Sequence, residues 1–424
     1  MAYAALAGDF PSATPVPPGV LALQRALVWL VGASGAIVFI EPSPYELTTL
    51  VAAVIFAATG LKLRLVFMPL LLLLVLLNVG YSIGAIPLLD QSNVANWIAT
   101  SWYMTVTVVF FALVLSEDTA ARLDMLRRGL IVGAMIAALA AIAGYLNLVP
   151  GGYDLLTLYG RARGTFKDPN VLGAFLILPA LLVLQSIVTA SLGKALRSTV
   201  AFAIMALAIL LAFSRAAWGG LIMTAAFMLL LMVLTSRSRA ERSRIVVMAF
   251  VAVVVAIMLI GVLMSFDSVA EMFKQRASFD QSYDEGRFGR FGRYVLGADM
   301  ALDLPFGIGP LQFHHYFPED THNSYLNAFM SGGWLSGICY PALVFMTVIL
   351  GFRHIFTPVP WQRTYLAIFA AFLGTVGESF IIDTDHWRHF FMMLGAMWGL
   401  FAAAQRDAAE PERAPMAPDG IDSP

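Results

Sequence analysis

The sequence predicts an all-α, polytopic membrane protein of about twelve transmembrane helices. Of its 424 residues, 59% are hydrophobic and only 12% are charged, whereas about a quarter of the residues of an ordinary soluble domain are charged. The apolar runs recur at about the 20 residues that cross a hydrocarbon core as a helix. None of them alternates apolar and polar residues as a barrel strand does. Composition and run length together therefore favour a helical bundle in a membrane.

The apolar runs define the expected spans in chain order. The second run is short, and only "SRAAWGG" separates the seventh run from the eighth. Since sequence patterns place helix ends to within a few residues, these bounds are approximate. The expected spans are 21–40, 45–61, 65–84, 95–115, 129–149, 170–190, 199–217, 218–235, 245–265, 323–350, 364–382 and 389–404.

The distribution of Lys and Arg predicts the orientation, because positively charged loops stay in the cytoplasm. With both termini inside, 16 of the 26 basic residues lie in cytoplasmic segments. The remaining ten face outward and need another explanation. They are Arg161, Arg163, Lys167, Arg215, Lys274, Arg276, Arg287, Arg290, Arg293 and Arg388.

The two ends of the chain are expected to be short cytoplasmic tails around a transmembrane domain at 21–404. Residues 1–20 lack the basic region of a signal peptide, so the first span is expected to act as an uncleaved insertion signal. The Pro-rich, polar residues 405–424 are expected to be disordered. Cys339 is the only cysteine, which excludes an internal disulfide. The net charge of −1 does not by itself decide about nucleic acid, and no nucleic-acid partner is expected.

One long extracytoplasmic segment is expected at 265–321, between the ninth and tenth spans. Loops of this length in compact proteins are usually functional or disordered, and this one is not of low complexity. It contains an expected helix near 290–303, followed by the turn "PFGIGP" at 305–310. It ends at His322 and Asn323, directly before an apolar run. We therefore expect the segment to be periplasmic and to carry function.

Four sequence blocks resemble the bacterial O-antigen ligase and O-antigen polymerase family. They occur in the order "RGTFKDPNVLGAF", "FSRAAWGGL", "GRFGRYVLGADMALDLPFGIGPLQF" and "HNSYLNAFMSGGWLSG", and the resemblance is strongest over about 160–340. It implies a membrane glycosyltransferase of the inverting type at the outer face of the bacterial inner membrane. Such enzymes pass a glycan from an undecaprenyl diphosphate carrier to an acceptor hydroxyl, and they require neither a metal nor another cofactor.

The resemblance also implies roles for particular residues. By position, Arg215 matches the arginine of the "SR-small-small-W" block, Arg290 matches the arginine fifteen residues before the Pro-Gly turn, and His322 matches the histidine of the "HN-x-Y-L" block. The sequence departs from the family pattern at Ser331, where many members carry an acid. In ligases the acceptor is a lipid A core sugar, and in polymerases it is another carrier-linked unit. We favour the ligase, and the polymerase of O-antigen or exopolysaccharide is the alternative.

The residue types suit this chemistry independently of the resemblance. A diphosphate leaving group gains negative charge as the bond to the sugar breaks, and guanidinium groups bind phosphate oxygens with paired hydrogen bonds. A sugar hydroxyl is a poor nucleophile, and histidine is the side chain whose ordinary pKa suits a general base near neutral pH. Arg215, Arg290 and His322 are therefore the catalytic candidates. They are expected to converge on a cavity that is open to the outer leaflet of the membrane.

Each candidate also has a simpler interpretation. Arg215 could extend toward water from a helix end, and Arg290 belongs to a basic triplet that could contact lipid headgroups. His322 and Asn323 could form only the N-terminus of a helix. Six further residues are candidates for substrate binding because they lie in or near the four blocks or in an outer loop. They are Arg287, Arg293, Arg163, Asn323, Trp218 and Arg388.

The stretch "DTDHWRH" at 383–389 has the residue types of a metal site. Asp383, Asp385, His386 and His389 could act as ligands, but Arg388 among them would oppose a cation. Substrate or packing contacts are the favoured interpretation, and no metal is expected.

The rival from another class is a polysaccharide flippase or transporter. Transporters usually place ionisable residues near the bilayer midplane, whereas Arg215, Glu378, Asp383 and His322 all fall near one face here. An enzyme at that face fits better, and a structural scaffold would need no such cluster.

Overall fold

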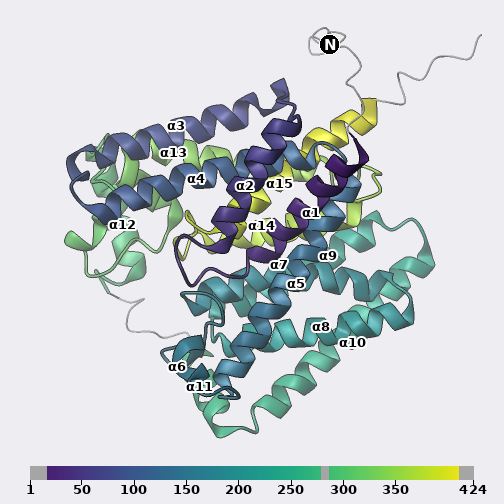
Figure 1. Ribbon diagram of the computed structural model, residues 1–424. Coiled ribbons are helices and arrows are strands. Elements are labelled where there is room, and N and C mark those ends of the chain that lie inside the picture. Colours follow the sequence, from purple (N-terminus) through teal and green to yellow (C-terminus); the bar gives the residue numbers. More distant parts are fainter. Residues whose placement is uncertain (1–16, 278–285, 410–424) are drawn as a thin grey trace, which may run out of the picture.

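A computed structural model describes residues 17–277 and 286–409 of the chain. Long helices account for most of this part (Figure 1). They are α1 (Pro18–Ser34), α2 (Pro44–Thr59), α3 (Met68–Ala85), α4 (Ser92–Leu115), α5 (Thr119–Tyr145), α7 (Pro169–Thr189), α8 (Leu192–Leu211), α9 (Arg215–Thr235), α10 (Arg239–Leu263), α13 (Ser324–Arg353), α14 (Gln362–Glu378) and α15 (Arg388–Ala409).

Short elements connect these helices. The only strands among the described residues form one antiparallel pair, which confirms the prediction of an all-α fold. The short elements are η2 (Leu65–Phe67), η3 (Ile86–Leu88), α6 (Gly152–Leu156), β1 (Thr157–Leu158), β2 (Arg161–Ala162), α11 (Asp267–Ala277), α12 (Arg290–Asp303) and η4 (Phe313–His315).

Each of the twelve expected spans falls on one of the long helices. In the described part of the chain, eight helices are long and apolar enough to cross a membrane. They correspond to α3, α4, α5, α7, α8, α9, α10 and α13. Membrane crossing by α1, α2, α14 and α15 stays a prediction, as does the count of twelve. The expected helix near 290–303 is α12. Most of both predicted tails lies outside the described residues, and α15 extends to Ala409, a few residues into the second of them.

The weak boundary between the seventh and eighth spans is a real break between two helices. Helix α8 ends at Leu211, and Phe213 adopts a left-handed backbone conformation with φ 46°. The hydroxyl of Ser214 then accepts a hydrogen bond from the backbone N–H of Ala217, 3.3 Å away, which caps α9. The chain therefore turns back within three residues and places Arg215 at the first position of α9.

The helix connections gather on two opposite sides of the bundle. On one side, Arg25 pairs with Asp118 at 2.8 Å, and Arg406 donates to the carbonyl of Ser116 at 2.6 Å. The beginning of α1 and the end of α15 lie on this side (Figure 1). On the other side, Lys167 pairs with Glu41 at 2.7 Å. We call this other side, to which the loop 379–387 also belongs, the site side. The alternation agrees with the predicted order of inner and outer loops.

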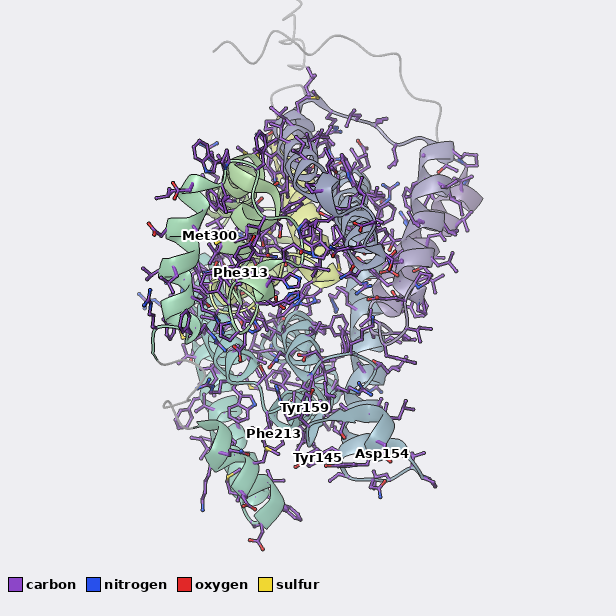
Figure 2. The ribbon with its side chains drawn as sticks, turned by 90° about the vertical axis from the view of Figure 1, so that its left-hand side faces the viewer. Tyr145, Asp154, Tyr159, Phe213, Met300 and Phe313 are labelled. Carbon is purple, nitrogen blue, oxygen red and sulfur yellow. The ribbon has the colours of Figure 1, made fainter. Side chains whose placement is uncertain are left out.

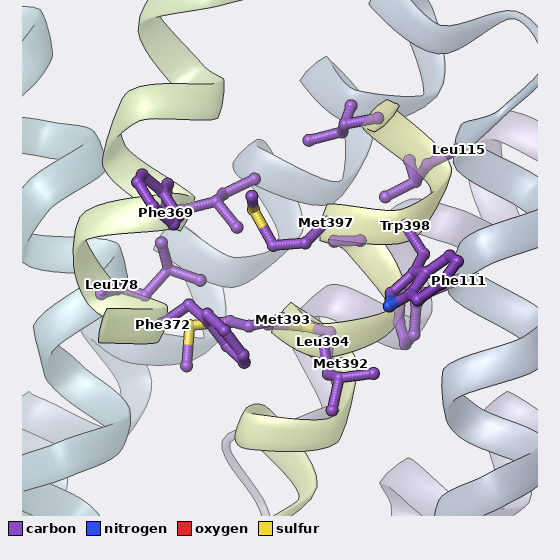
Figure 3. Packing of buried hydrophobic residues seen from close by; sticks show 14 of the residues in the cluster. Phe111, Leu115, Leu178, Phe369, Phe372, Met392, Met393, Leu394, Met397 and Trp398 are labelled. Atoms are coloured by element: carbon purple, nitrogen blue, oxygen red, sulfur yellow. The ribbon is translucent and has the colours of Figure 1, made fainter. Parts of the chain in front are cut away.

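Burial distinguishes the central helix from the peripheral ones. In the apolar stretch of α7, 83% of the residues are buried by the rest of the protein, whereas only 6% are buried in the apolar stretch of α10. A helix that is apolar on all faces must be covered either by protein or by lipid. Around α7, Phe369 and Phe372 of α14 lie beside Leu178, and Trp398 of α15 lies beside Phe111 of α4 (Figure 3). The core is therefore built from α4, α7, α14 and α15, and it supports the site side.

Helix α13 is interrupted where the "PFGIGP" turn docks against it. Gly333 has φ 64°, and the backbone is not helical at Gly332 and Gly333. The turn satisfies the polar groups that the break exposes, because Ile308 donates to the carbonyl of Met330 at 2.7 Å and Trp334 donates to that of Pro305 at 3.0 Å. The predicted turn is thus a built-in part of the helix packing.

Candidate active site

The loop between α14 and α15 organises the beginning of α13. Asp383 accepts three hydrogen bonds, from the hydroxyl of Thr321 at 2.8 Å and from the backbone N–H groups of Asn323 at 2.9 Å and His322 at 3.0 Å. Ser324 donates through its backbone to the carbonyl of Ser379 at 2.9 Å. A single carboxylate therefore fixes the three residues that precede α13.

His322 is held in a left-handed backbone conformation, with φ 47°. Non-glycine residues rarely adopt this conformation, which costs about 1–3 kcal/mol and persists only where the surroundings impose it. Asp383 binds the N–H of His322, and the hydroxyl of Tyr294 in α12 donates to its carbonyl at 2.7 Å. Both polar groups of the His322 peptide backbone are thus engaged by two different elements. The conformation of His322 is imposed by the fold.

The His322 side chain has the electrostatic environment of a neutral base. Burial lowers its pKa below the ordinary 6.5, and the guanidinium of Arg290 lowers the pKa further. Its Nδ1 lies 3.9 Å from a carboxylate oxygen of Asp383, and 37% of its side chain is exposed. The imidazole is therefore mainly uncharged at neutral pH and accessible to a ligand.

Asp383 itself has opposing influences on its pKa. Burial raises its pKa, and the neighbouring Asp385 raises it further, while the hydrogen bonds from Thr321, Asn323 and His322 lower it. Asp385 in turn accepts a hydrogen bond from the amide of Asn327 at 2.7 Å. Asp383 and Asp385 are thus held in the site by hydrogen bonds with α13 and the residues directly before it.

Helix α12 brings two of the predicted arginines to His322. Both Arg290 and Arg293 act on the pKa of His322, so their guanidinium groups lie within electrostatic reach of the imidazole. Arg293 is 1% exposed and pairs with Glu319 at 2.8 Å. The structure therefore places Arg290 beside the candidate base and uses Arg293 in an ion pair that ties α12 to the loop before α13.

Arg215 occupies a different cluster of the structure. It begins α9, two residues after Phe213, which Figure 2 shows near Tyr145 and Tyr159 and apart from Phe313. Trp218, also predicted to bind substrate, stacks on Phe273 of α11 with ring centroids 4.9 Å apart and donates to the carbonyl of Ile209 at 3.1 Å. The convergence of Arg215 with His322 stays a prediction.

The other predicted binding residues have varied surroundings. Asn323 caps α13 by accepting from the backbone of Tyr325 and Leu326, both at 3.0 Å. Arg388 pairs with Glu46 and Glu41. Arg287 is exposed and lies over the ring of Phe288, and Arg163 donates to the carbonyl of Leu155. Arg287 and Arg163 thus lie at the surface, whereas Asn323 and Arg388 also have structural partners.

The stretch "DTDHWRH" is used for protein contacts. Besides the contacts of Asp383 and Asp385, a ring nitrogen of His386 lies 3.3 Å from the carbonyl of Trp97. In the described residues, no group of three His, Cys, Asp or Glu side chains is placed to hold a metal ion. The sequence pattern suggested ligands or packing, but it carried no sign that Asp383 binds a backbone sixty residues earlier.

A cavity of about 510 Å³ adjoins this arrangement. Thr321 and Asp383 belong to its wall, as does Phe313, which Figure 2 shows beside α12. Arg215, Arg290 and His322 are not in the part of the wall that the described residues form. The predicted single cavity shared by all three side chains therefore stays a prediction.

These features define a polytopic helical membrane protein with a one-sided polar site around a neutral histidine. The family described as O-antigen ligase, Wzy_C, matches residues 200–340, a segment that contains Arg215, Arg290 and His322. The match confirms the resemblance to the O-antigen ligase and polymerase family. Asp383 and Arg388 lie beyond the matched segment. No curated protein matches the chain.

Proposed function

We propose that this protein transfers a glycan from an undecaprenyl diphosphate carrier to an acceptor hydroxyl at the periplasmic face of the bacterial inner membrane. The acceptor is a lipid A core sugar, as in an O-antigen ligase. The family match supports lipid-linked glycan substrates and a membrane glycosyltransferase. A polymerase that uses a second carrier-linked glycan as acceptor is the alternative within the same chemistry.

The observation that carries the proposal is the neutral, positioned imidazole of His322 beside the guanidinium of Arg290. A general base must be unprotonated before the reaction, and burial and Arg290 both favour that state of His322. Asp383 and Tyr294 hold the His322 backbone at both polar groups, so the backbone that carries the imidazole does not need to be ordered when substrate binds.

The proposed reaction is a single displacement. The acceptor hydroxyl gives its proton to His322 as its oxygen bonds to the anomeric carbon, and the bond from that carbon to the carrier diphosphate breaks with its electron pair. The diphosphate leaves as an anion, stabilised by Arg290 and Arg215. Since the attack comes from the side opposite to the leaving group, the anomeric configuration inverts.

The remaining predicted binding residues fall into two groups in this proposal. Arg287 and Arg163, at the surface, attract the anionic carrier toward the site. Arg293, Arg388, Asn323 and Trp218 shape the site through their protein contacts, which a substrate would have to share or replace. The variant Arg290→Lys tests whether Arg290 binds the diphosphate, because lysine keeps the positive charge but cannot form the paired hydrogen bonds of a guanidinium group.

Transfer by purified protein in lipid nanodiscs tests the proposal. A carrier-linked glycan is supplied with either lipid A core or a second carrier-linked glycan, and the extended product is identified by mass spectrometry. Extension of lipid A core supports the ligase, and extension of the carrier-linked glycan supports the polymerase. Added EDTA should leave the rate unchanged. Movement of the glycan across the membrane without a new glycosidic bond would instead identify a flippase.

A further inference from the structure

The cavity next to His322 has the wall of a carbohydrate site. Its volume of about 510 Å³ lies within the roughly 300–1,000 Å³ of small-molecule sites. The first turns of α4 supply Asn93, Asn96 and Trp97 to the wall, and Asn327 is supplied by α13. The ring of Trp97 is itself fixed by contacts with the rings of Tyr81 and His386, with centroids 4.9 and 4.2 Å away. Amide groups around a fixed indole ring suit a polar ring with an apolar face.

The charge of the cavity disfavours a phosphate. Its wall carries the acids Glu41, Asp320, Asp383 and Asp385, and the described wall contains neither Lys nor Arg. Glu41 is paired with Lys167 and Arg388 behind the wall, so the negative charge comes from the three aspartates. Asp385 is only 6% exposed. Carboxylates and amide oxygens accept hydrogen bonds from hydroxyl groups, whereas they repel an anion. The cavity therefore favours a ligand with many hydroxyl groups and no negative charge nearby.

The cavity and the arginines approach His322 from different elements. Thr321 and Asp383 belong to the cavity wall, and Asp383 binds the N–H of His322. Helix α12, which carries Arg290, contacts the carbonyl of the same residue through Tyr294. An inverting displacement needs the attacking hydroxyl and the leaving diphosphate on opposite sides of the anomeric carbon. With the diphosphate bound by Arg290, which is not in the described wall, the cavity is left for the attacking hydroxyl.

We propose that this cavity is the acceptor subsite and that it binds an uncharged sugar ring, with Asn93, Asn96 and Trp97 as its specificity-determining residues. The assignment to the acceptor rests on the proposed function. It follows that a phosphate or carboxylate group on the sugar that carries the reacting hydroxyl should oppose binding.

The first experiment measures binding without any donor. Full-length protein in nanodiscs is titrated with glucose and with glucose 6-phosphate, and saturation-transfer NMR gives their relative affinities. Glucose should bind at least tenfold more tightly. The double variant Asn93→Ala/Asn96→Ala should lower the affinity for glucose by about tenfold, as expected for the loss of two hydrogen bonds. Ser92→Ala, on the same turn of α4 but outside the wall, is the matched control.

A second variant tests the charge argument without removing the amides. Asp385→Asn should reduce the difference in affinity between glucose and glucose 6-phosphate. The substitution removes one buried negative charge and keeps a hydrogen-bond acceptor for Asn327. Equal binding of glucose and glucose 6-phosphate by the unmodified protein would overturn the proposal. So would unchanged glucose binding in the folded double variant.

Kinetics separate this inference from the proposed function. In the transfer assay, the double variant should raise the KM for the acceptor about tenfold and leave the KM for the carrier-linked donor unchanged. An increase in the donor KM alone would assign the cavity to the donor glycan and overturn the acceptor assignment. Sugar binding of the expected kind without any transfer would uphold the sugar site and contradict the proposed function.

Discussion

At the scale of single residues, the central feature is the strained backbone of His322. A left-handed histidine persists only where its surroundings over-determine it, and here Asp383 and Tyr294 bind its two backbone polar groups. The same contacts tie the His322 backbone to both the acidic loop 379–387 and α12. Strain at this residue is thus combined with a lowered pKa, which keeps the imidazole of His322 neutral at physiological pH.

His322→Ala should abolish turnover while leaving donor binding largely intact. Only the transition state uses the proton transfer, so the loss should appear in kcat, by about 10²–10⁴-fold. The transfer rate and the equilibrium binding of carrier-linked glycan are measured on the same purified variant. Near-normal transfer by the variant would remove His322 from the role of base.

The pH dependence of transfer should follow the lowered pKa of His322. The base works when neutral, so activity is full above its pKa and is lost as pH falls through it. Because burial and Arg290 lower this pKa from 6.5, the half-maximal rate should lie below pH 6.5. The measurement is kcat/KM from about pH 4.5 to about pH 8, a range that spans the titration of a histidine. Donor binding is measured over the same pH range. A loss of rate beginning well above pH 7 would contradict the assignment.

At the scale of elements, the break in α13 joins the segment 265–321, predicted to be extracytoplasmic, to the bundle. The "PFGIGP" turn enters the gap at Gly332 and Gly333 and exchanges backbone hydrogen bonds with both sides of it. The start of α13, with His322, is therefore fixed from α12 as well as from the loop 379–387.

Gly333→Ala should destabilise the protein strongly. A Cβ at Gly333 would overlap the carbonyl oxygen of Pro305, and φ 64° disfavours any L side chain. The matched control is Gly219→Ala in α9, where a Cβ meets nothing within 4 Å and helix propensity gains. Thermal unfolding in detergent should show a much lower midpoint for Gly333→Ala and an unchanged or higher midpoint for Gly219→Ala. Equal midpoints would contradict the role given to the break.

Helix α12 is expected to lie on the outer leaflet of the membrane. Its outward face is apolar, with Phe291 58% exposed and Val295 and Leu302 each 71% exposed, while its other face packs on α13. Amphipathic helices of this kind bury the apolar face at the headgroup boundary. A fluorophore attached at Val295→Cys should be quenched by lipids brominated on their acyl chains, and one at His314→Cys, exposed in η4 outside this helix face, much less. Equal quenching would place α12 away from the lipid.

At the scale of the whole molecule, the loops on the two sides of the bundle carry different chemistry. Ion pairs at one side join short connections, such as Arg64 with Glu117 at 2.7 Å. The site side gathers α6, α11, α12 and the loop 379–387. This asymmetry fits an enzyme that works at one membrane face.

Cysteine labelling of intact cells should show the site side facing the periplasm. Cys339 is buried, so single cysteines can be introduced elsewhere. Tyr159→Cys, at a side chain 83% exposed on the site side, should react with a membrane-impermeable maleimide from outside. Arg128→Cys, in an exposed position near the start of α5 on the other side, should react only after permeabilisation. The reverse pattern would invert the predicted topology.

Composition and periodicity were sufficient to predict the helices. Apolar runs of membrane-spanning length have few alternatives to helix, because a bilayer leaves no water to satisfy the backbone. All twelve expected runs coincide with helices, and α12 was expected at the range it occupies. The short blocks around Arg215, Arg290 and His322 likewise indicated the family that matches residues 200–340.

The geometry of the site was decided by tertiary structure alone. Three features of the site bring together residues that are distant in sequence. Asp383 binds the backbone of His322, Glu319 pairs with Arg293, and Asn96 and Asp385 line the same cavity. No local pattern encodes such pairs, because each depends on how helices of similar apolar sequence pack against one another. The sequence by itself determined which segments form the long apolar helices and which family the chain resembles. Packing determined which of those residues meet.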